Sequence, residues 1–343
     1  MKKFEFKRRQ QSIVNKPFSL EEAIEKFLDA KRLQKRTDRT IQTYERALKH
    51  YSSYCNKHGL SGEADTSFSA YIHYMTFEKT KWDDHPTNHS NIIGVSARTV
   101  NNTIRVLRVF YNWAIAQKLI GHNPAKSTGL QTENDDGFEV FTDDEIKLLL
   151  NAPNHRTYTG FRDYVMILVL IDTGLRIGEL SSLKRGDFEL QYRMIVVNAE
   201  TSKSRRTRSI PISPTTTEAL RELFDFIGID DEDSDEFVFL TQYGDQYLGD
   251  NFAKNLKNYA ARVGGLKARV SPHTFRHYFA VKFLRNGGDP FALMKILGHT
   301  DISMTQRYVQ YASAEVKEIH DKASPVESLL TSSKVRKRKI KFK

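Results

Sequence analysis

The stretch from Ile296 to Ser313, "ILGHTDISMTQRYVQYAS", allows three interpretations of the C-terminal half of this sequence. Gly298 marks a turn between two short helical segments, a pattern compatible with a DNA-reading helix-turn-helix. The same segments are also compatible with plain core helices. In the third interpretation they hold Tyr308 as a nucleophile. A free phenol has a pKa of about 10, so Tyr308 would then need positively charged surroundings to attack at neutral pH.

Three upstream segments carry residues that could supply those charges. Arg176 lies in "TGLRIGEL", three residues before Glu179, which indicates either a surface ion pair or a guanidinium held rigidly beside a cleft. In "SPHTFRH", His273 and Arg276 share one face near the start of a predicted helix, where free N–H groups favour anions. Lys203 lies in a basic turn. Together these groups are what a phosphate would require.

The spacing of His273 and His277, four residues apart, also suits a helical zinc pair. However, no Glu follows His273, and Cys55 is the single cysteine of the chain. We therefore expect no metal and no other cofactor. The sequence also lacks the glycine-rich and serine motifs of P-loop, Rossmann and serine-hydrolase enzymes.

The net charge of +11 is concentrated at the two ends of the 343-residue chain. The first 16 residues carry six Lys and Arg against one Glu, and the last ten carry seven basic and no acidic side chains. We interpret 1–17 and 326–343 as basic extensions that are either disordered or lie along DNA phosphates. The longest apolar run, "VMILVLI" at 165–171, is too short to span a membrane, and the N-terminus lacks a signal peptide's apolar core. We expect a soluble, cytoplasmic, nucleoid-associated protein.

Helical periodicity dominates both halves of the sequence, which predicts a mainly α protein with two domains. The first domain covers 18–122, and a polar linker over 123–140 follows it. The second domain covers 141–325 and begins with a capping box of Thr142 and Glu145.

A small antiparallel sheet is expected in the second domain. The runs "MIVVNA" at 194–199 and "RSIPI" at 208–212 flank a polar turn and predict a hairpin. The run "FVFL" at 237–240 predicts a further strand.

The predicted helix over 97–117 has an apolar face and an opposite polar face without acidic residues. The polar face is either simply solvated or contacts DNA phosphates and base edges. The apolar face consists of Val100, Ile104, Leu107, Tyr111 and Ala114. The candidate DNA contacts are Arg98, Asn101, Arg105 and Arg108 on this helix, with Arg205 and Arg206 in the basic turn.

The ordered set Arg176, Lys203, His273, Arg276, His299 and Tyr308 resembles that of the tyrosine recombinase family, the phage or lambda-type integrases. The segments that carry the resemblance are "TGLRIGEL", "SPHTFRH" and "LGHTDISMTQRY", with the tyrosine nine residues beyond the His. Lys203 stands eight residues before Pro211, as in the family's lysine-bearing turn. The resemblance covers residues 18–325.

The resemblance implies a helical SAM-like core-binding domain and an α+β DNA breaking-rejoining domain that clamp duplex DNA. It implies a site-specific recombinase that acts on specific core sites as a homotetramer, with or without accessory proteins, and without metal or ATP. Tyr308 would form a 3′-phosphotyrosine, and two strand exchanges would pass through a Holliday junction. Tyr311 is the alternative nucleophile. The competing functions are a non-cleaving DNA-binding regulator and a type IB topoisomerase-like enzyme.

The resemblance also implies a role for each site residue. Arg176 and Arg276 would hold the non-bridging phosphate oxygens. Lys203 would protonate the leaving 5′-oxygen, and His273 would act as an acid–base partner. His299 would hydrogen-bond the phosphate.

Overall fold

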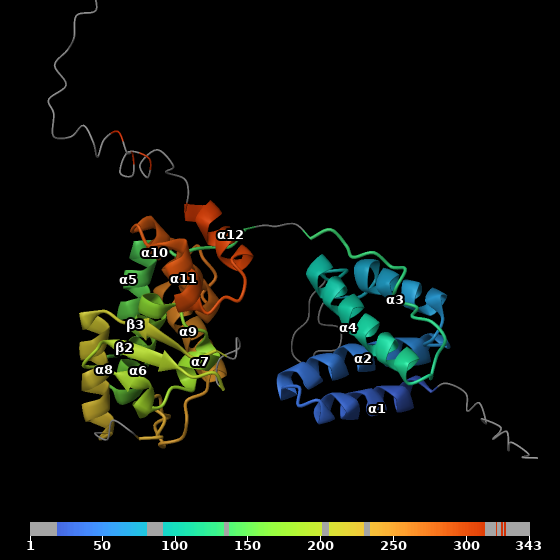
Figure 1. Cartoon of the computed structure of the whole chain (residues 1–343), viewed down its shortest axis with the longest axis horizontal. Coiled ribbons are helices and arrows are strands. Elements are labelled where there is room, and N and C mark those ends of the chain that lie inside the picture. Colours follow the sequence, from blue (N-terminus) through green and yellow to red (C-terminus); the bar gives the residue numbers. More distant parts are fainter. Residues whose placement is uncertain are drawn as a thin grey trace, which may run out of the picture. The chain divides into compact units, whose positions relative to one another are not determined.

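The computed structural model describes residues 19–80, 92–133, 137–200, 206–229 and 234–312, with the single residues 320, 324 and 326. The chain divides into two compact units, residues 1–136 and 137–343, and this boundary falls within the predicted linker (Figure 1). Both are mainly helical, and the second contains a small antiparallel sheet, so the predicted fold class is confirmed. Several predicted features lie outside the described residues, namely Lys203, Arg205, the extension over 1–17 and almost all of 326–343.

The described part of the first unit contains four helices around an aromatic core. Phe27 packs edge-on against Phe110 at 5.5 Å between ring centroids. Ser19, Thr37 and Ser96 cap the first, second and fourth helices by accepting a backbone N–H three residues on. The predicted apolar face of the fourth helix is buried, as its spacing indicated. The helices are α1 (Leu20–Leu33), α2 (Asp38–His58), α3 (Asp65–Phe77) and α4 (Ala97–Ala116).

The second unit is built around α6, a helix without an exposed residue that packs against α8 and α10. The capping box predicted at Thr142 and Glu145 begins its first helix. Its helices are α5 (Asp143–Asn151), α6 (Tyr158–Thr173), α7 (Ile177–Ser181), α8 (Pro214–Ile227), α9 (Gly249–Val263), α10 (Pro272–Arg285), α11 (Pro290–Leu297) and α12 (Ser303–Ala312), with a short 3₁₀ turn at Arg185–Asp187.

The sheet consists of β1 (Phe188–Glu189), β2 (Met194–Val197) and β3 (Arg208–Pro211) in that order, with both pairs antiparallel. The predicted hairpin is β2 and β3, with Ile195 opposite Ile210, and both of these side chains are fully buried. β1 was not predicted, because a two-residue strand has too short a pattern to recognise.

The strand predicted over 237–240 is wrong. Phe237 and Leu240 form isolated bridges to Lys184 and Gln246, and the segment joins no sheet. Val238 and Phe239 between them are fully buried. The apolar composition of the segment therefore reflects its place in the core rather than strand pairing.

Candidate active site

Arg176 is held at the start of α7 by the carboxylate three residues on. Its Nη1 donates to Glu179 Oε1 at 3.1 Å, and its backbone N–H donates to Glu179 Oε2 at 3.1 Å. Gly174, at φ +62°, ends α6 and turns the chain toward Arg176. A Cβ on Gly174 would lie 2.4 Å from the Phe279 ring, so both the backbone conformation and the close packing require glycine. The neighbouring carboxylate fixes the guanidinium, as the sequence suggested.

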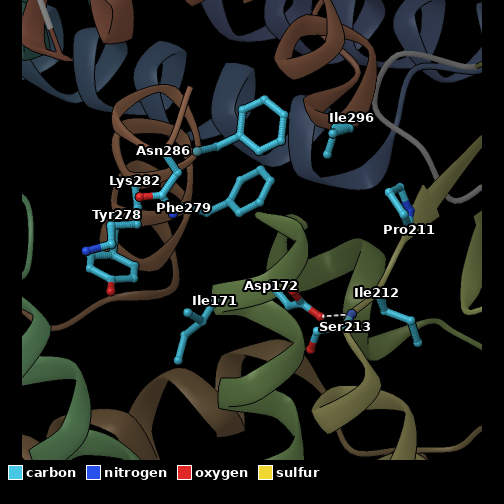
Figure 2. A pocket seen from close by; sticks show the side chains of 11 residues that line it. Ile171, Asp172, Pro211, Ile212, Ser213, Tyr278, Phe279, Lys282, Asn286 and Ile296 are labelled. Carbon is cyan, nitrogen blue, oxygen red and sulfur yellow. Dashed lines mark hydrogen bonds between the residues drawn. The ribbon is translucent and has the colours of Figure 1, made fainter. Parts of the chain in front are cut away.

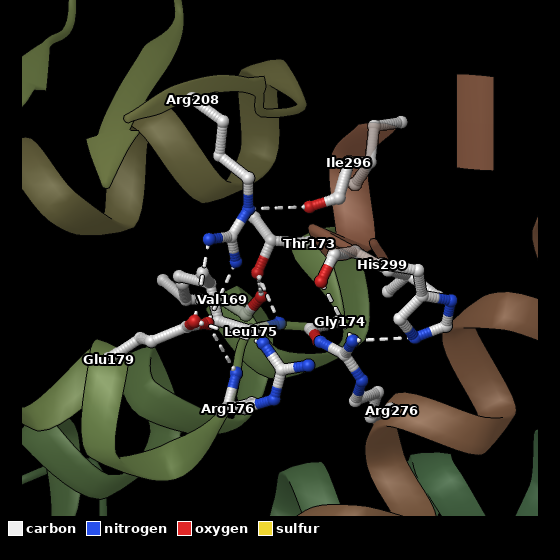
Figure 3. Close-up of polar contacts among 11 residues, drawn as sticks. Val169, Thr173, Gly174, Leu175, Arg176, Glu179, Arg208, Arg276, Ile296 and His299 are labelled. Carbon is white, nitrogen blue, oxygen red and sulfur yellow. Dashed lines mark hydrogen bonds and ion pairs between the residues drawn. The ribbon is translucent and has the colours of Figure 1, made fainter. Parts of the chain in front are cut away.

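Glu179 is shared with a second arginine, Arg208 at the start of β3. Arg208 Nη2 lies 2.8 Å from Glu179 Oε2, and Arg208 Nε donates to the Ile296 carbonyl at 2.9 Å (Figure 3). Burial raises the pKa of Glu179, but the hydrogen bonds and charges of Arg208 and Arg176 outweigh burial and leave its pKa below the ordinary value. Arg208 thus connects the carboxylate that orients Arg176 with the turn that leads to His299.

Arg276, on α10, has a side chain that is only 2% exposed. Its Nη1 donates to the Gly174 carbonyl at 2.7 Å, and its Nη2 donates to the Leu297 carbonyl at 2.8 Å (Figure 3). Burial, and then the positive charge of Arg176, lower the pKa of Arg276 to about 10, so it remains charged at neutral pH. Two backbone carbonyls, rather than a carboxylate, therefore position this guanidinium.

The hydrogen bonds of His299 determine its tautomer. Arg276 Nη2 lies 3.0 Å from His299 Nε2, and a guanidinium can only donate, so Nε2 accepts. The proton is therefore on Nδ1, which donates to Thr305 Oγ1 at 2.8 Å. Burial, and then the charges of Arg276 and Arg176, lower the pKa of His299 to about 4, so the ring is neutral at pH 7. In this neutral form His299 accepts a hydrogen bond from Arg276 and helps to hold its guanidinium in place.

Tyr308, on α12, is 7% exposed and stands beside these groups. The ring of His299 lies parallel to the Tyr308 ring, with centroids 6.2 Å apart and planes 8° apart. Burial raises the pKa of Tyr308. The charge and hydrogen bond of Arg276 and the charge of Arg307 lower it, but by less, so the pKa remains above its ordinary value. The positive surroundings expected from the sequence are present, but they do not by themselves ionise the phenol.

His277 contacts the phenol directly, because its Nδ1 lies 3.0 Å from Tyr308 Oη. Phe138 stacks on the His277 ring at 4.6 Å and meets the Tyr308 ring edge-on at 5.2 Å. Burial, and then the charges of His273 and Arg276, lower the pKa of His277 to about 4. From the sequence, His277 was considered only as a metal ligand, and the described residues contain no group of three or more metal-ligating side chains.

One cavity of about 350 Å³ brings five of the six predicted catalytic residues together. His273 is exposed on the first turn of α10, while Arg276 and Tyr308 are buried. Lys203, the sixth, lies outside the described residues, and so does the side chain of Tyr311. The cavity is lined by Phe138, Arg176, His273, Arg276, His277, His299, Met304, Arg307 and Tyr308.

A second cavity of about 410 Å³ lies between α6, β3 and α10 and contains none of the predicted catalytic residues (Figure 2). The charged side chains that line this second cavity already make contacts that stabilise the folded unit. Asp172 accepts the Ser213 backbone N–H at 2.6 Å, next to the start of α8, and Lys282 pairs with Asp143 at 2.6 Å. The first cavity is therefore the candidate active site.

The polar face of α4, predicted to contact DNA, is largely occupied by the segment that follows the helix. Asn101 is 1% exposed, donates to the Gln131 carbonyl at 2.9 Å and accepts the Gln131 N–H at 2.8 Å. Arg98 pairs with Glu133 at 3.2 Å, so an acidic residue outside the helix supplies the charge that the helix lacks. In this structure the Asn101 side chain is buried and bonded within the unit rather than presented to solvent, and its assignment as a DNA contact stays a prediction.

The arginines of this face are also engaged within the unit. Arg105 lies 3.7 Å from Glu133, and Arg108 donates to the carbonyls of Ala125 and Thr128. Arg206, next to the basic turn of the second unit, is exposed. Arg206 and the side chains of Arg98 and Arg105, which are 70% and 50% exposed, remain accessible, and their contacts with DNA stay predictions. Arg108 mainly holds the segment after α4.

Among the described residues, no helix is long and apolar enough to cross a membrane.

Both units match known families. Residues 139–315 match the phage integrase family, and residues 24–120 match the phage integrase N-terminal SAM-like domain. The tyrosine recombinase XerD of Listeria monocytogenes serotype 4b is 30% identical over 290 residues, which cover 83% of this chain and 92% of the relative. The tyrosine recombinase XerD of Staphylococcus aureus is 26% identical over 309 residues, which cover 89% of this chain and 99% of the relative.

Solved structures share the fold at lower sequence identity. The Tn1549 transposon integrase in complex with a circular intermediate DNA gives a TM-score of 0.66 at 19% identity, over 88% of this chain and 99% of that chain. The XerH site-specific recombinase bound to a palindromic difH substrate gives a TM-score of 0.64 at 16% identity, over 90% of this chain and 85% of that chain. With the arginines, histidines and tyrosine gathered in one cavity, these matches show that the chain belongs to the phage integrase family of tyrosine recombinases.

Proposed function

We propose a catalytic role for each residue of the candidate active site. The protein is a recombinase, an enzyme that breaks and rejoins DNA strands at specific sites. Tyr308 attacks the scissile phosphate, which forms a 3′-phosphotyrosine and releases a 5′-hydroxyl. The covalent bond keeps the energy of the phosphodiester, so religation requires no ATP. The observation that supports this best is the convergence of two fixed guanidiniums and Tyr308 on one cavity.

Arg176 and Arg276 hold the two non-bridging oxygens of the phosphate. Charge builds on these oxygens in the transition state, and donors that are already in place stabilise it without reorganising. Glu179 fixes one guanidinium, and the carbonyls of Gly174 and Leu297 fix the other. Of the five guanidinium donors of Arg276, those that bond His299 and Tyr308 can turn to the phosphate.

The leaving 5′-oxygen needs a proton, and we assign this role to Lys203 of the basic turn. His273 stands at the exposed rim of the cavity and serves as an acid–base partner there. His299 contributes by keeping Arg276 in position through Nε2. To hydrogen-bond the phosphate, His299 must carry a proton on Nε2, a form that the negative charge of the bound phosphate favours.

The test is a suicide substrate, a nicked duplex from the DNA that flanks the gene, incubated with the protein in EDTA. The wild-type protein should give a covalent protein–DNA band, and Tyr308→Phe should abolish the band while DNA binding is retained. A band that survives in Tyr308→Phe but disappears in Tyr311→Phe would refute the assignment and move the nucleophile by three residues. Loss of the wild-type band in EDTA alone would indicate a metal-dependent reaction.

The assembly on DNA is part of the same proposal. Two protomers bind each core site, and a homotetramer joins two sites in the cytoplasm, where two strand exchanges pass through a Holliday junction. Light scattering of the protein with a two-site duplex should give the mass of four protomers. A complex that stays at two protomers and still recombines would exclude the tetramer.

A further inference from the structure

The proton of Tyr308 must leave before or during the attack on phosphorus, and the surroundings of the phenol do not remove it in advance. Tyr308 is 7% exposed, and burial raises the pKa of its hydroxyl in spite of the nearby arginines. The neutral phenol is therefore the resting state at neutral pH. A nucleophile of this kind needs a proton acceptor within hydrogen-bond reach of its oxygen.

Among the described groups around Tyr308 Oη, His277 is the acceptor that the geometry favours. Arg276 and Arg307 can only donate hydrogen bonds. Both ring nitrogens of His299 are engaged, one by Arg276 and one by Thr305. His277 places a ring nitrogen, Nδ1, at hydrogen-bonding distance, 3.0 Å from the phenolic oxygen.

His273 is the acid–base histidine expected from the resemblance, but it stands one helical turn before His277. The two rings lie 5.8 Å apart, with their planes at 23°. His273 is exposed at the rim of the cavity, whereas His277 is half-buried between Phe138 and Tyr308. His277 therefore lies inside the cavity next to the Tyr308 hydroxyl, whereas His273 lies at the rim.

We propose that His277 is the general base of strand cleavage, a catalytic residue that accepts the Tyr308 proton on Nδ1. This inference rests on the proposed function, in which Tyr308 is the nucleophile. The O–H bond of Tyr308 breaks and an N–H bond forms on His277, while the tyrosine oxygen bonds to phosphorus and the P–O5′ bond breaks. The 5′-oxygen takes its proton from a different group. In religation the imidazolium of His277 returns its proton to Tyr308.

The charges that face His277 suit a base that acts only on bound DNA. His273 and Arg276 on α10 and Arg307 on α12 disfavour a positive imidazolium, so the ring is neutral and ready to accept in the free enzyme. A DNA phosphate beside Arg276 and Arg307 brings negative charge that offsets theirs. The pKa of His277 then rises, because a nearby negative charge favours the protonated form, and the base becomes stronger when its substrate is in place.

The decisive variant is His277→Asn, since the Asn Oδ1 can occupy the position of Nδ1 and accept the phenol hydrogen bond but cannot take its proton. General-base catalysis contributes on the order of 10²–10⁴ in rate. We expect the single-turnover rate of covalent-complex formation to fall by a factor in this range, with unchanged DNA binding and thermal stability. His155→Asn is the matched control, because His155 is exposed in the same unit, bonds to the Leu150 carbonyl and, like His277, contacts a tyrosine ring, that of Tyr164 at 4.2 Å.

Two readouts separate a base from a structural residue. The rate of His277→Asn should climb with pH more steeply than that of the wild type, since hydroxide replaces the missing base. A substrate with a 5′-bridging sulfur leaves without a proton, so it should not rescue His277→Asn. If His277→Asn does not fold, His277→Gln is measured in the same way.

The outcomes distinguish this inference from the proposed function. A rate within about threefold of the wild type, well below the 10²–10⁴ of general-base catalysis, would overturn the role of His277. Rescue by the 5′-bridging sulfur would overturn it too, because His277 would then serve the leaving group. In both cases Tyr308→Phe would still abolish the covalent complex. A covalent complex in Tyr308→Phe would instead overturn the proposed function and the inference with it.

Discussion

Glu179 holds two arginines at once, and replacing it by glutamine tests how the active site is positioned. Its side chain is 2% exposed, while those of Arg176 and Arg208 are 22% and 9% exposed. Glu179→Gln keeps one oxygen as an acceptor but directs an NH₂ group, a donor, at a guanidinium. One of the two arginines therefore loses its partner in a place where little water can replace it.

The magnitude follows from this burial. Removing one member of a buried ion pair costs about 3–5 kcal/mol. The retained oxygen and the partial exposure of Arg176 favour the lower end, so we expect the free energy of unfolding to fall by about 3 kcal/mol. For a unit of this size, each kcal/mol shifts Tm by about 2–4 °C, so the Tm of the second unit should fall by about 6–12 °C. Because Arg176 loses its orienting carboxylate, strand cleavage should slow as well.

The assay is thermal and urea unfolding of the full chain, with single-turnover cleavage of the suicide substrate below the transition. Glu218→Gln is the control, since the Glu218 side chain is 78% exposed and lies 3.5 Å from Arg221. It should change the free energy of unfolding by less than about 0.5 kcal/mol. If Glu179→Gln is destabilised by no more than about 1 kcal/mol, the ordinary effect of a point substitution, the shared carboxylate does not hold these arginines.

Three further predictions concern other contacts. Gly298→Ala places a Cβ 3.1 Å from the Arg208 guanidinium at φ +65°, so it should cost about 1–3 kcal/mol and slow cleavage; an unchanged unfolding midpoint would contradict this. Asn101→Ala removes the paired hydrogen bonds to Gln131 and should lower the free energy of unfolding of the first unit by about 2 kcal/mol, measured by urea denaturation. Burial raises the pKa of Glu145, but hydrogen bonds from backbone N–H groups outweigh burial and lower the pKa overall. The ionised carboxylate therefore stabilises the folded state fully above the unfolded pKa of about 4.5, and this stabilisation is lost as the pH falls through the lower folded pKa. Glu145→Gln should therefore flatten the loss of stability measured on acidification below that pH.

Short-range patterns in the sequence were enough to predict much of this fold. The capping box at Thr142, the helical spacing of apolar residues in α4, and the two runs that flank a polar turn in β2 and β3 depend on neighbours a few residues apart, and each was found where expected. The order of the arginines, histidines and tyrosine in the sequence also indicated one site.

The tertiary structure decided which partners those side chains have, because the contacts join residues far apart in the chain. The bond from His277 to Tyr308 spans 31 positions, the pair of Arg208 and Glu179 spans 29, and the bond from Arg208 to the Ile296 carbonyl spans 88. No periodicity reports contacts at such separations. Local spacing therefore predicted where each side chain sits on its own helix or strand, whereas packing alone placed His277, rather than His273, against the phenol.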